Sequence, residues 1–213
     1  MMADYVFNLY DELGDLPILK ESNSFSIIND TAIILTHYGN DKRRIAATTF
    51  AVSQLLKLNP KIFIIFVELT FDDSKPYFEW LTEKDYVVYK NLQGGNQHKN
   101  LFQKEALFNY AVENLLPNTC EYLIFHDSDV YPFDITWAQK ARDKIVENFD
   151  SLVQLFDYVI DSKDERLNKW SLGISFCEEK GYSREIHNPG ISWGVSRQII
   201  EKNHGFNIWG IAG

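Results

Sequence analysis

A chain of 213 residues is long enough for one sizeable α/β domain and short for two, so we predict a single domain. Hydrophobic residues make up 45% of the chain and aromatic residues 15%, which excludes a disordered protein. The net charge of −9 argues against nucleic-acid or membrane-surface binding, because both need a basic field. We recognise no signal peptide and no transmembrane segment, and two widely separated cysteines suit a reducing compartment, so we expect a cytoplasmic protein.

The beginning of the chain predicts an arm followed by a strand and a helix. Residues 1–30 mix acidic and apolar residues, and we expect them to form an N-terminal arm before a domain at 31–213. Apolar residues at 31–38 predict the first strand, which ends at a Gly-Asn pair. A helical apolar stripe follows at about 41–58, and Asn59-Pro60 ends it because proline cannot continue a helix.

The middle of the chain predicts strands and helices in alternation. A second strand at 61–69 is apolar throughout, as expected when both of its faces are covered, and Glu68 lies near its end. The remaining elements are a strand at 86–89, a helix at 101–116, a strand that begins at Tyr122, and a helix at about 137–149. This order predicts an α/β fold, with a mostly parallel sheet and helices on both of its faces.

The strand that begins at Tyr122 leads into two carboxylates one residue apart, Asp127 and Asp129. Because side chains alternate along an extended chain, we expect both carboxylates on one face and Ser128 on the other. Ligands bind at the carboxyl ends of strands in such sheets, and two neighbouring carboxylates repel each other unless a cation lies between them. The pattern predicts a site for Mn²⁺ or Mg²⁺ with Asp127 and Asp129 as ligands. Asp-Ser-Asp is also common in surface turns, which is the structural alternative.

The helix before this strand carries a second motif, in which Phe102, Lys104, Asn109 and Ala111 follow the spacing F-x-K-x-x-x-x-N-x-A. Together with Asp127-Ser128-Asp129, it resembles the DxD signature and the F-x-[KR]-x-x-x-x-N-x-[GA] segment of galactosyltransferase-like glycosyltransferases with the GT-A fold. The chain looks most like β-1,4-galactosyltransferases, chondroitin polymerase domains and polypeptide N-acetylgalactosaminyltransferases.

A third segment, at 190–210, is similar to the G-G-x-x-x-x-[ST]-[KR] … N-G-F … W-G segment of the same family. It departs from the family pattern at two positions. Ile191 stands where the second glycine is expected, and His204 stands where the asparagine is expected.

The resemblance implies a metal-dependent hexosyltransferase that moves a sugar from a UDP-sugar donor to a saccharide or another hydroxyl acceptor. Its nucleotide-binding half would be 31–132 and its acceptor half 133–213. The metal would stabilise the diphosphate leaving group. The implied nucleotide-binding residues are His37, Tyr38, Gly39, Glu68, Phe102, Lys104 and Asp127. Neither the donor sugar, the acceptor, the anomeric outcome nor the oligomeric state is indicated.

Three consecutive cations, Lys42, Arg43 and Arg44, open the first predicted helix. Cations oppose the helix dipole at this end, which favours the hypothesis that an anion such as a phosphate lies nearby.

The last residues do not contain the carboxylate that acts as catalytic base in this family, where an acidic pair follows Trp-Gly. Here the sequence runs from Trp209-Gly210 to Gly213, so the expected carboxylate lies beyond Gly213 or is lacking. Two alternatives to an active transferase stay open. One is a nucleotide-sugar-binding module that is inactive alone. The other is an Asp-x-Asp phosphohydrolase, although its aspartate pair usually follows the first strand rather than the fourth.

Overall fold

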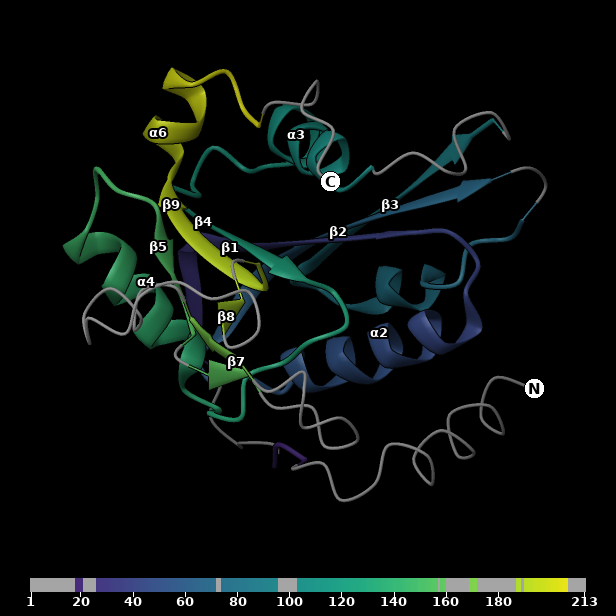
Figure 1. Ribbon diagram of the computed structural model, residues 1–213, viewed down its shortest axis with the longest axis horizontal. Helices are drawn as coiled ribbons and strands as arrows, with labels where there is room; N and C mark the ends of the chain where they lie inside the picture. Colours follow the sequence, from purple (N-terminus) through teal and green to yellow (C-terminus); the bar gives the residue numbers. More distant parts are fainter. Residues whose placement is uncertain are drawn as a thin grey trace.

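A six-stranded sheet organises the chain. A computed structural model describes residues 18–20, 26–71, 74–95, 103–156, 158–159, 169–171, 187–188 and 190–206. The strands of this sheet are β1 (Ile27–Tyr38), β2 (Lys61–Phe71), β3 (Val87–Gly94), β4 (Tyr122–Asp127), β5 (Val153–Gln154) and β9 (Ser192–Ser196). Their order is β3-β2-β1-β4-β9-β5 (Figure 1). The first four strands in sequence run parallel, whereas β9 pairs antiparallel with both β4 and β5.

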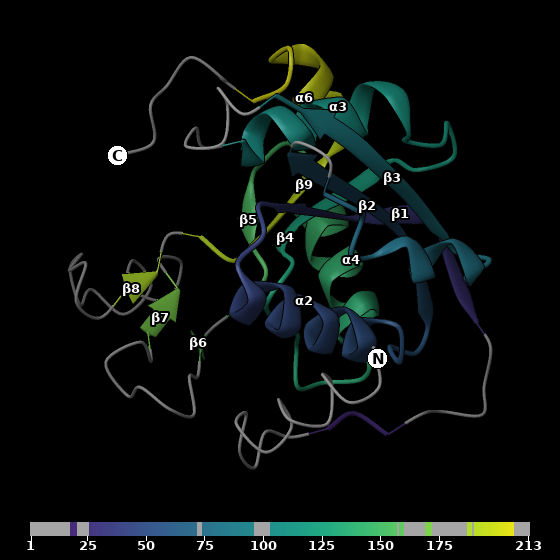
Figure 2. The same ribbon diagram turned by 90° about the vertical axis from the view of Figure 1, so that its right-hand side faces the viewer.

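Helices cover both faces of this sheet. They are α2 (Lys42–Leu55), α3 (Lys104–Asn114), α4 (Trp137–Glu147) and α6 (Arg197–Lys202), and a short 3₁₀ helix, η1 (Glu79–Glu83), precedes β3. In Figures 1 and 2, α3 and α6 lie above the sheet and α2 and α4 lie below it. A second, three-stranded sheet consists of β6 (Tyr158–Val159), β7 (Lys169–Ser171) and β8 (His187–Asn188), and Figure 2 shows it to one side of the main sheet.

The alternation of side chains along β1 divides the core into two apolar layers. Ile33 and Leu35 pack with buried residues of α2 and α4, whereas Ala32 and Ile34 pack with buried residues of α3 and α6. Because both faces of β1 and β2 are covered, most residues of these strands are apolar, and the apolar residues do not alternate with polar ones in their central parts. The predicted α/β fold, with a mostly parallel sheet and helices on both faces, is confirmed.

The boundaries of several elements differ from the prediction. β1 begins at Ile27, inside the predicted arm, because Ile27 and Ile28 already pair with β2. β3 continues to Gly94 instead of ending at residue 89, since its polar residues keep the parallel register with β2 as far as Phe71. The helices predicted at 41–58, 101–116 and 137–149 are all shorter, as α2, α3 and α4. Residues 101 and 102 lie outside the described part of the chain.

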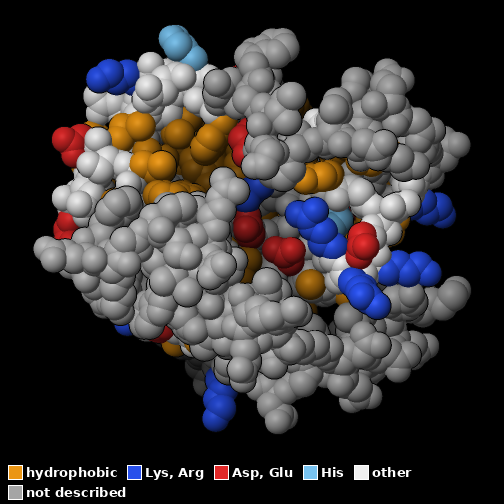
Figure 3. Space-filling view, viewed as in Figure 1, with side chains coloured by type: hydrophobic (Ala, Val, Ile, Leu, Met, Phe, Trp, Pro, Cys, Tyr) orange, Lys and Arg blue, Asp and Glu red, His pale blue; other side chains and the backbone are white. Residues whose placement is uncertain are grey.

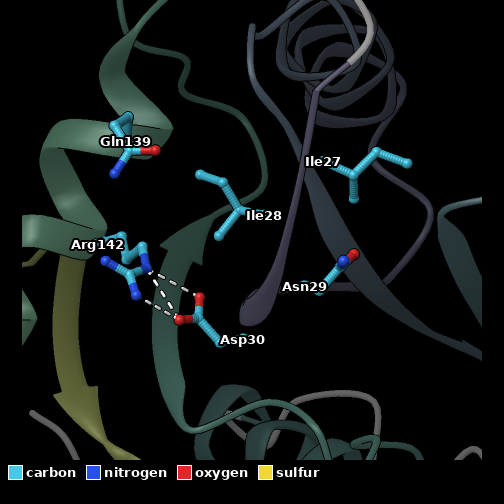
Figure 4. Close-up of a pocket in the computed structure, with 6 residues that line it drawn as sticks. All are labelled: Ile27, Ile28, Asn29, Asp30, Gln139 and Arg142. Carbon is cyan, nitrogen blue, oxygen red and sulfur yellow. Dashed lines mark hydrogen bonds and ion pairs between the residues drawn. The ribbon is translucent and has the colours of Figure 1, made fainter.

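An ion pair joins the beginning of β1 to α4. Arg142 Nε lies 2.9 Å and 3.0 Å from the two carboxylate oxygens of Asp30, and Arg142 Nη2 lies 2.5 Å from Oδ2 (Figure 4). These hydrogen bonds lower the pKa of Asp30. The pair borders a depression of about 330 Å³ lined by Ile27, Ile28, Asn29, Asp30, Gln139 and Arg142. This depression lies at the amino end of β1, whereas ligands bind such sheets at the carboxyl ends.

None of the helices in the described part of the chain has the length and apolar character needed to cross a bilayer.

Candidate functional site

The carboxyl ends of β1 and β4 lie at the point where the order in which the chain adds strands to the sheet reverses. The chain passes from β1 to β2 on one side, and β4 later adds to the other side of β1. Such switch points are the usual ligand sites of open α/β sheets. The register brings predicted site residues to this edge, because Asp127 lies opposite Thr36, and Glu68 lies opposite His37.

Asp127 is the last residue of β4, and its carboxylate forms an ion pair with Lys104 at the start of α3. Its backbone N–H donates to the carbonyl of Ile191 at 2.8 Å, which fixes the end of the strand against the segment before β9. The structure therefore brings together Lys104 and Asp127, two residues that the sequence analysis proposed for the same site.

Asp129 lies in the turn after β4, and its Oδ2 lies 3.8 Å from Nε of Arg44 in the first turn of α2. The expectation that both aspartates share one face is wrong. The strand ends at Asp127, so the strict alternation stops there, and the two carboxylates pair with helices on opposite faces of the sheet. They still interact, since partial desolvation and the neighbouring Asp127 carboxylate raise the pKa of Asp129.

Arg44 also contacts Tyr38, at the end of β1. Its guanidinium carbon lies 5.1 Å from the centre of the Tyr38 ring, which is a cation–π distance. Asp41 caps α2, because its carboxylate accepts a hydrogen bond from the Arg44 backbone N–H at 2.9 Å. Gly39 makes the turn between β1 and α2 with φ of 91°, a conformation that favours glycine. Of the three consecutive cations, Arg44 is the one that the structure pairs with an aspartate of the site.

His37 is buried beneath this edge. The hydroxyl of Thr48 on α2 lies 3.4 Å from His37 Nδ1 and 3.4 Å from the hydroxyl of Ser128. Burial lowers the pKa of His37 to about 4, so the imidazole is neutral at physiological pH. The Thr48 hydroxyl thus links His37 of β1 and the turn that carries Asp129 to α2. Direct contact between His37, Tyr38 or Gly39 and a nucleotide stays a prediction.

Glu68 is fully buried near the carboxyl end of β2, three residues before the strand ends at Phe71, and it accepts several hydrogen bonds. Its Oε1 accepts from the backbone N–H of Tyr77 at 2.8 Å. Its Oε2 accepts from the N–H of Phe78 at 3.2 Å and from the Tyr89 hydroxyl at 2.5 Å. Burial raises the pKa of the Glu68 carboxyl. Glu68 thus fixes the segment before η1, and Phe78 of that segment contacts the His37 ring at 4.9 Å. The predicted hydrogen bond from Glu68 to the base or ribose stays a prediction.

Glu68→Gln tests this role of the buried carboxylate. The glutamine amide cannot accept from both Tyr77 and Phe78 as the two carboxylate oxygens do, so one backbone N–H loses its acceptor. We expect the free energy of unfolding to fall by about 1–3 kcal/mol, the usual effect of an unsatisfied buried donor. Urea denaturation measures it. Glu79→Gln, at an exposed position nearby, is the control and should change stability by less than about 0.5 kcal/mol.

The structure explains the spacing of Lys104 and Asn109 on α3. Lys104 reaches Asp127, while the Asn109 side chain donates to the carbonyl of Phe206 at 2.9 Å and accepts from its N–H at 2.7 Å. The Phe206 ring packs on Phe125 with centroids 4.6 Å apart. The three sequence segments that resemble the glycosyltransferase family thus contact one another. The sequence analysis did not predict these two hydrogen bonds between Asn109 and the Phe206 backbone. The position of Asn109 in the F-x-K-x-x-x-x-N-x-A motif was the feature of the sequence that could have indicated a role for it.

Both departures from the family pattern fall on residues with positive φ. Ile191, which stands for a glycine, has φ of 76°, and His204, which stands for an asparagine, has φ of 56°. This backbone conformation favours glycine and asparagine. At Ile191 this backbone conformation is strained, because the side chain is β-branched. The carbonyl of Ile191 also accepts the hydrogen bond from the Asp127 backbone N–H.

The described residues contain no group of three or more His, Cys, Asp or Glu side chains that could hold a metal ion. The two aspartates would therefore be the protein ligands available in this part of the chain. That set fits Mn²⁺ or Mg²⁺, because such ions at phosphate sites commonly take one or two carboxylates and complete their coordination with substrate phosphates and water. Figure 3 shows acidic and basic side chains close together near the middle of one face.

Three residues of the motifs discussed above, Phe102, Trp209 and Gly210, lie outside the described residues. The aspartate pair follows the fourth strand of the chain, as the sequence predicted, and not the first strand, where phosphohydrolases usually carry it.

Neither the protein-family models nor the curated protein sequences match this chain. Among solved structures, it is similar to the mannosyltransferase PcManGT from Pyrobaculum calidifontis in complex with GDP-Man and Mn²⁺. The TM-score is 0.50 at 13% sequence identity, over 96% of this chain and 55% of that one. The chain therefore spans about half the length of this neighbour. At this identity the likeness shows the fold alone, which is the Rossmann-like fold of GT-A glycosyltransferases.

Proposed function

We propose that this protein is a metal-dependent glycosyltransferase that moves a sugar from a nucleotide-sugar donor, a UDP-sugar in the first instance, to a hydroxyl acceptor. The observation that carries the proposal is the pair Asp127 and Asp129 at the switch point between β1 and β4, on a glycosyltransferase-type fold. The neighbour with the same fold was solved with a nucleotide-sugar and Mn²⁺, which supports the class of donor and the metal. The galactosyltransferase-like motifs favour UDP, whereas the neighbour holds a guanosine nucleotide.

In the proposed reaction the protein binds and neutralises a diphosphate leaving group. A divalent cation bound by Asp127 and Asp129 would act there as a Lewis acid. Lys104 and Arg44 lie beside these carboxylates and would donate charge-assisted hydrogen bonds to the phosphate oxygens. Tyr38 and Gly39 form the rim of β1 at the same edge. The carboxylate expected to deprotonate the acceptor hydroxyl stays a prediction of the sequence resemblance.

Isothermal titration calorimetry tests the donor site directly. UDP and GDP are each titrated with saturating Mn²⁺ and again with EDTA, and uridine serves as the control without phosphates. We expect a nucleoside diphosphate to bind in Mn²⁺ and to bind much more weakly in EDTA, while uridine binds weakly in both. Equal affinity in Mn²⁺ and EDTA, or no binding of either diphosphate, would contradict the proposal.

The same protein incubated with UDP-galactose, UDP-N-acetylgalactosamine and GDP-mannose separates an active transferase from an inactive binding module. Slow Mn²⁺-dependent release of the nucleoside diphosphate supports the transferase chemistry. Binding of the donor without any release favours the module.

A further inference from the structure

Each aspartate of the site is paired with a cation of its own. Lys104 Nζ pairs with Asp127 Oδ1, and Arg44 Nε lies 3.8 Å from Asp129 Oδ2. The two cations come from opposite sides of the sheet, since Lys104 begins α3 and Arg44 lies in the first turn of α2. All four side chains are partly exposed, with 24% and 27% of the surface accessible in the first pair and 41% and 37% in the second. Incoming ligands can therefore reach both pairs.

We propose that Lys104 and Arg44 change partners when the donor binds. The divalent cation takes Asp127 and Asp129, and the diphosphate takes Lys104 and Arg44, so that the metal and the nucleotide bind strongly only together. This inference rests on the proposed function and adds to it a coupling between the two ligands.

The charges at this edge require such coupling. A dication that arrives alone meets two carboxylates already neutralised by two cations, and it has to displace both cations into water. A diphosphate that arrives alone draws the cations away and leaves two neighbouring carboxylates uncompensated. When both ligands arrive, every charge that loses its partner gains another of opposite sign. The ligands therefore help each other to bind.

Both cations have contacts that keep them at the edge after the exchange. Arg44 lies over the ring of Tyr38, and Lys104 Nζ lies 5.7 Å from the centre of the Phe108 ring. Neither contact involves Asp127 or Asp129. Lys104 and Arg44 would thus remain next to the phosphate position when the carboxylates bind the metal.

Calorimetry on the unmodified chain measures the coupling without any variant. Mn²⁺ is titrated alone and in the presence of saturating UDP, and UDP is titrated in EDTA and in saturating Mn²⁺, with GDP in parallel. We expect each ligand to raise the affinity for the other by the same factor, between about 5-fold and 150-fold. A factor near one in a protein that binds both ligands would overturn the exchange together with the metal dependence of the proposed function. A factor in the expected range combined with unchanged Mn²⁺ and UDP affinities in the Lys104 and Arg44 variants described below would overturn the exchange and leave the proposed function intact. No diphosphate binding under any of these conditions would overturn both.

Lys104→Met and Arg44→Met distinguish exchange from a merely structural ion pair, because exchange predicts effects of opposite sign. Each variant frees one carboxylate, so Mn²⁺ alone should bind several-fold more tightly than to the unmodified chain. Each also removes one phosphate contact, so UDP in saturating Mn²⁺ should bind about tenfold more weakly. Lys90→Met removes the same charge from an exposed position on β3 and should change neither affinity by more than about twofold. Weaker Mn²⁺ binding in both variants, or unchanged UDP binding, would contradict the proposal.

Discussion

Asp129→Asn is expected to weaken the Mn²⁺-dependent binding of UDP by about 100-fold or more while the protein stays folded. Asparagine keeps the shape of the side chain but loses the negative charge that a dication requires. Loss of a group that only orients a metal ligand already lowers metal affinity about 10–100-fold, and Asp129 is proposed as a ligand itself. The loss should appear in calorimetric titrations of UDP at a fixed Mn²⁺ concentration.

The fold should tolerate this substitution. The Arg44–Asp129 pair is more than a third exposed and 3.8 Å long, and exposed pairs of this kind contribute only about 0–1 kcal/mol. Asp134→Asn is the matched control, since it removes an exposed carboxylate that pairs with Lys140 outside the site. If Asp129→Asn and Asp134→Asn bind UDP equally well in Mn²⁺, Asp129 is not a metal ligand.

The sequence was sufficient to predict the strands that build the site. A strand that is covered on both faces appears in the sequence as a continuous apolar run. Such runs are easy to recognise, so the bounds of β1 and β2 were predicted to within a few residues. Asp127 could likewise be placed at the end of β4, because the apolar residues stop there. These are local properties of the chain, which short stretches of sequence determine by themselves.

The partners of the site residues could not be predicted in the same way. That Asp129 pairs with Arg44 depends on where α2 packs and on the turn that ends β4, and both are set by contacts between distant segments. The partners of Glu68 likewise depend on contacts between separate segments. Its carboxylate oxygens accept hydrogen bonds from Tyr77, Phe78 and Tyr89. A buried carboxylate at the end of a strand has the same sequence signal whether its partner is a ligand or a backbone N–H.

Two buried histidines should make the protein strongly sensitive to acid. His37 and His126 are 1% and 3% exposed, and burial lowers the pKa of each to about 4 from 6.5. His126 Nε2 lies 3.1 Å from the carbonyl of Val130, and its ring lies 5.4 Å from that of Trp137, so a second proton on this ring would be poorly solvated.

As the pH falls below about 6.5, the unfolded chain takes up a proton on each of these histidines, whereas the folded protein does so only near pH 4. Over that interval the unfolded state binds more protons, so the stability that the two neutral histidines contribute is complete above pH 6.5 and is lost progressively as the pH falls from 6.5 to about 4. Protonation of each histidine lowers the free energy of unfolding by about 3 kcal/mol. Together the two histidines remove a large part of the unfolding free energy of about 5–15 kcal/mol that is typical of a folded domain. Glu68, whose pKa is raised by burial, acts in the opposite direction, so variants have to be compared.

Urea denaturation at intervals between pH 7 and pH 4 measures this effect as a slope of unfolding free energy against pH. His37→Gln and His126→Gln each remove one of the two titrating groups and should therefore reduce the slope between pH 6 and pH 5 by about half, whatever their stability at pH 7. His204→Gln, at an exposed position, is the control and should keep the slope of the unmodified protein. Carboxylates with lowered pKa values, such as Asp30 and Asp134, lose their contribution below pH 4 and cannot produce a slope at pH 6. A slope that is the same in all four proteins would show that the two buried histidines are not the source of the acid sensitivity.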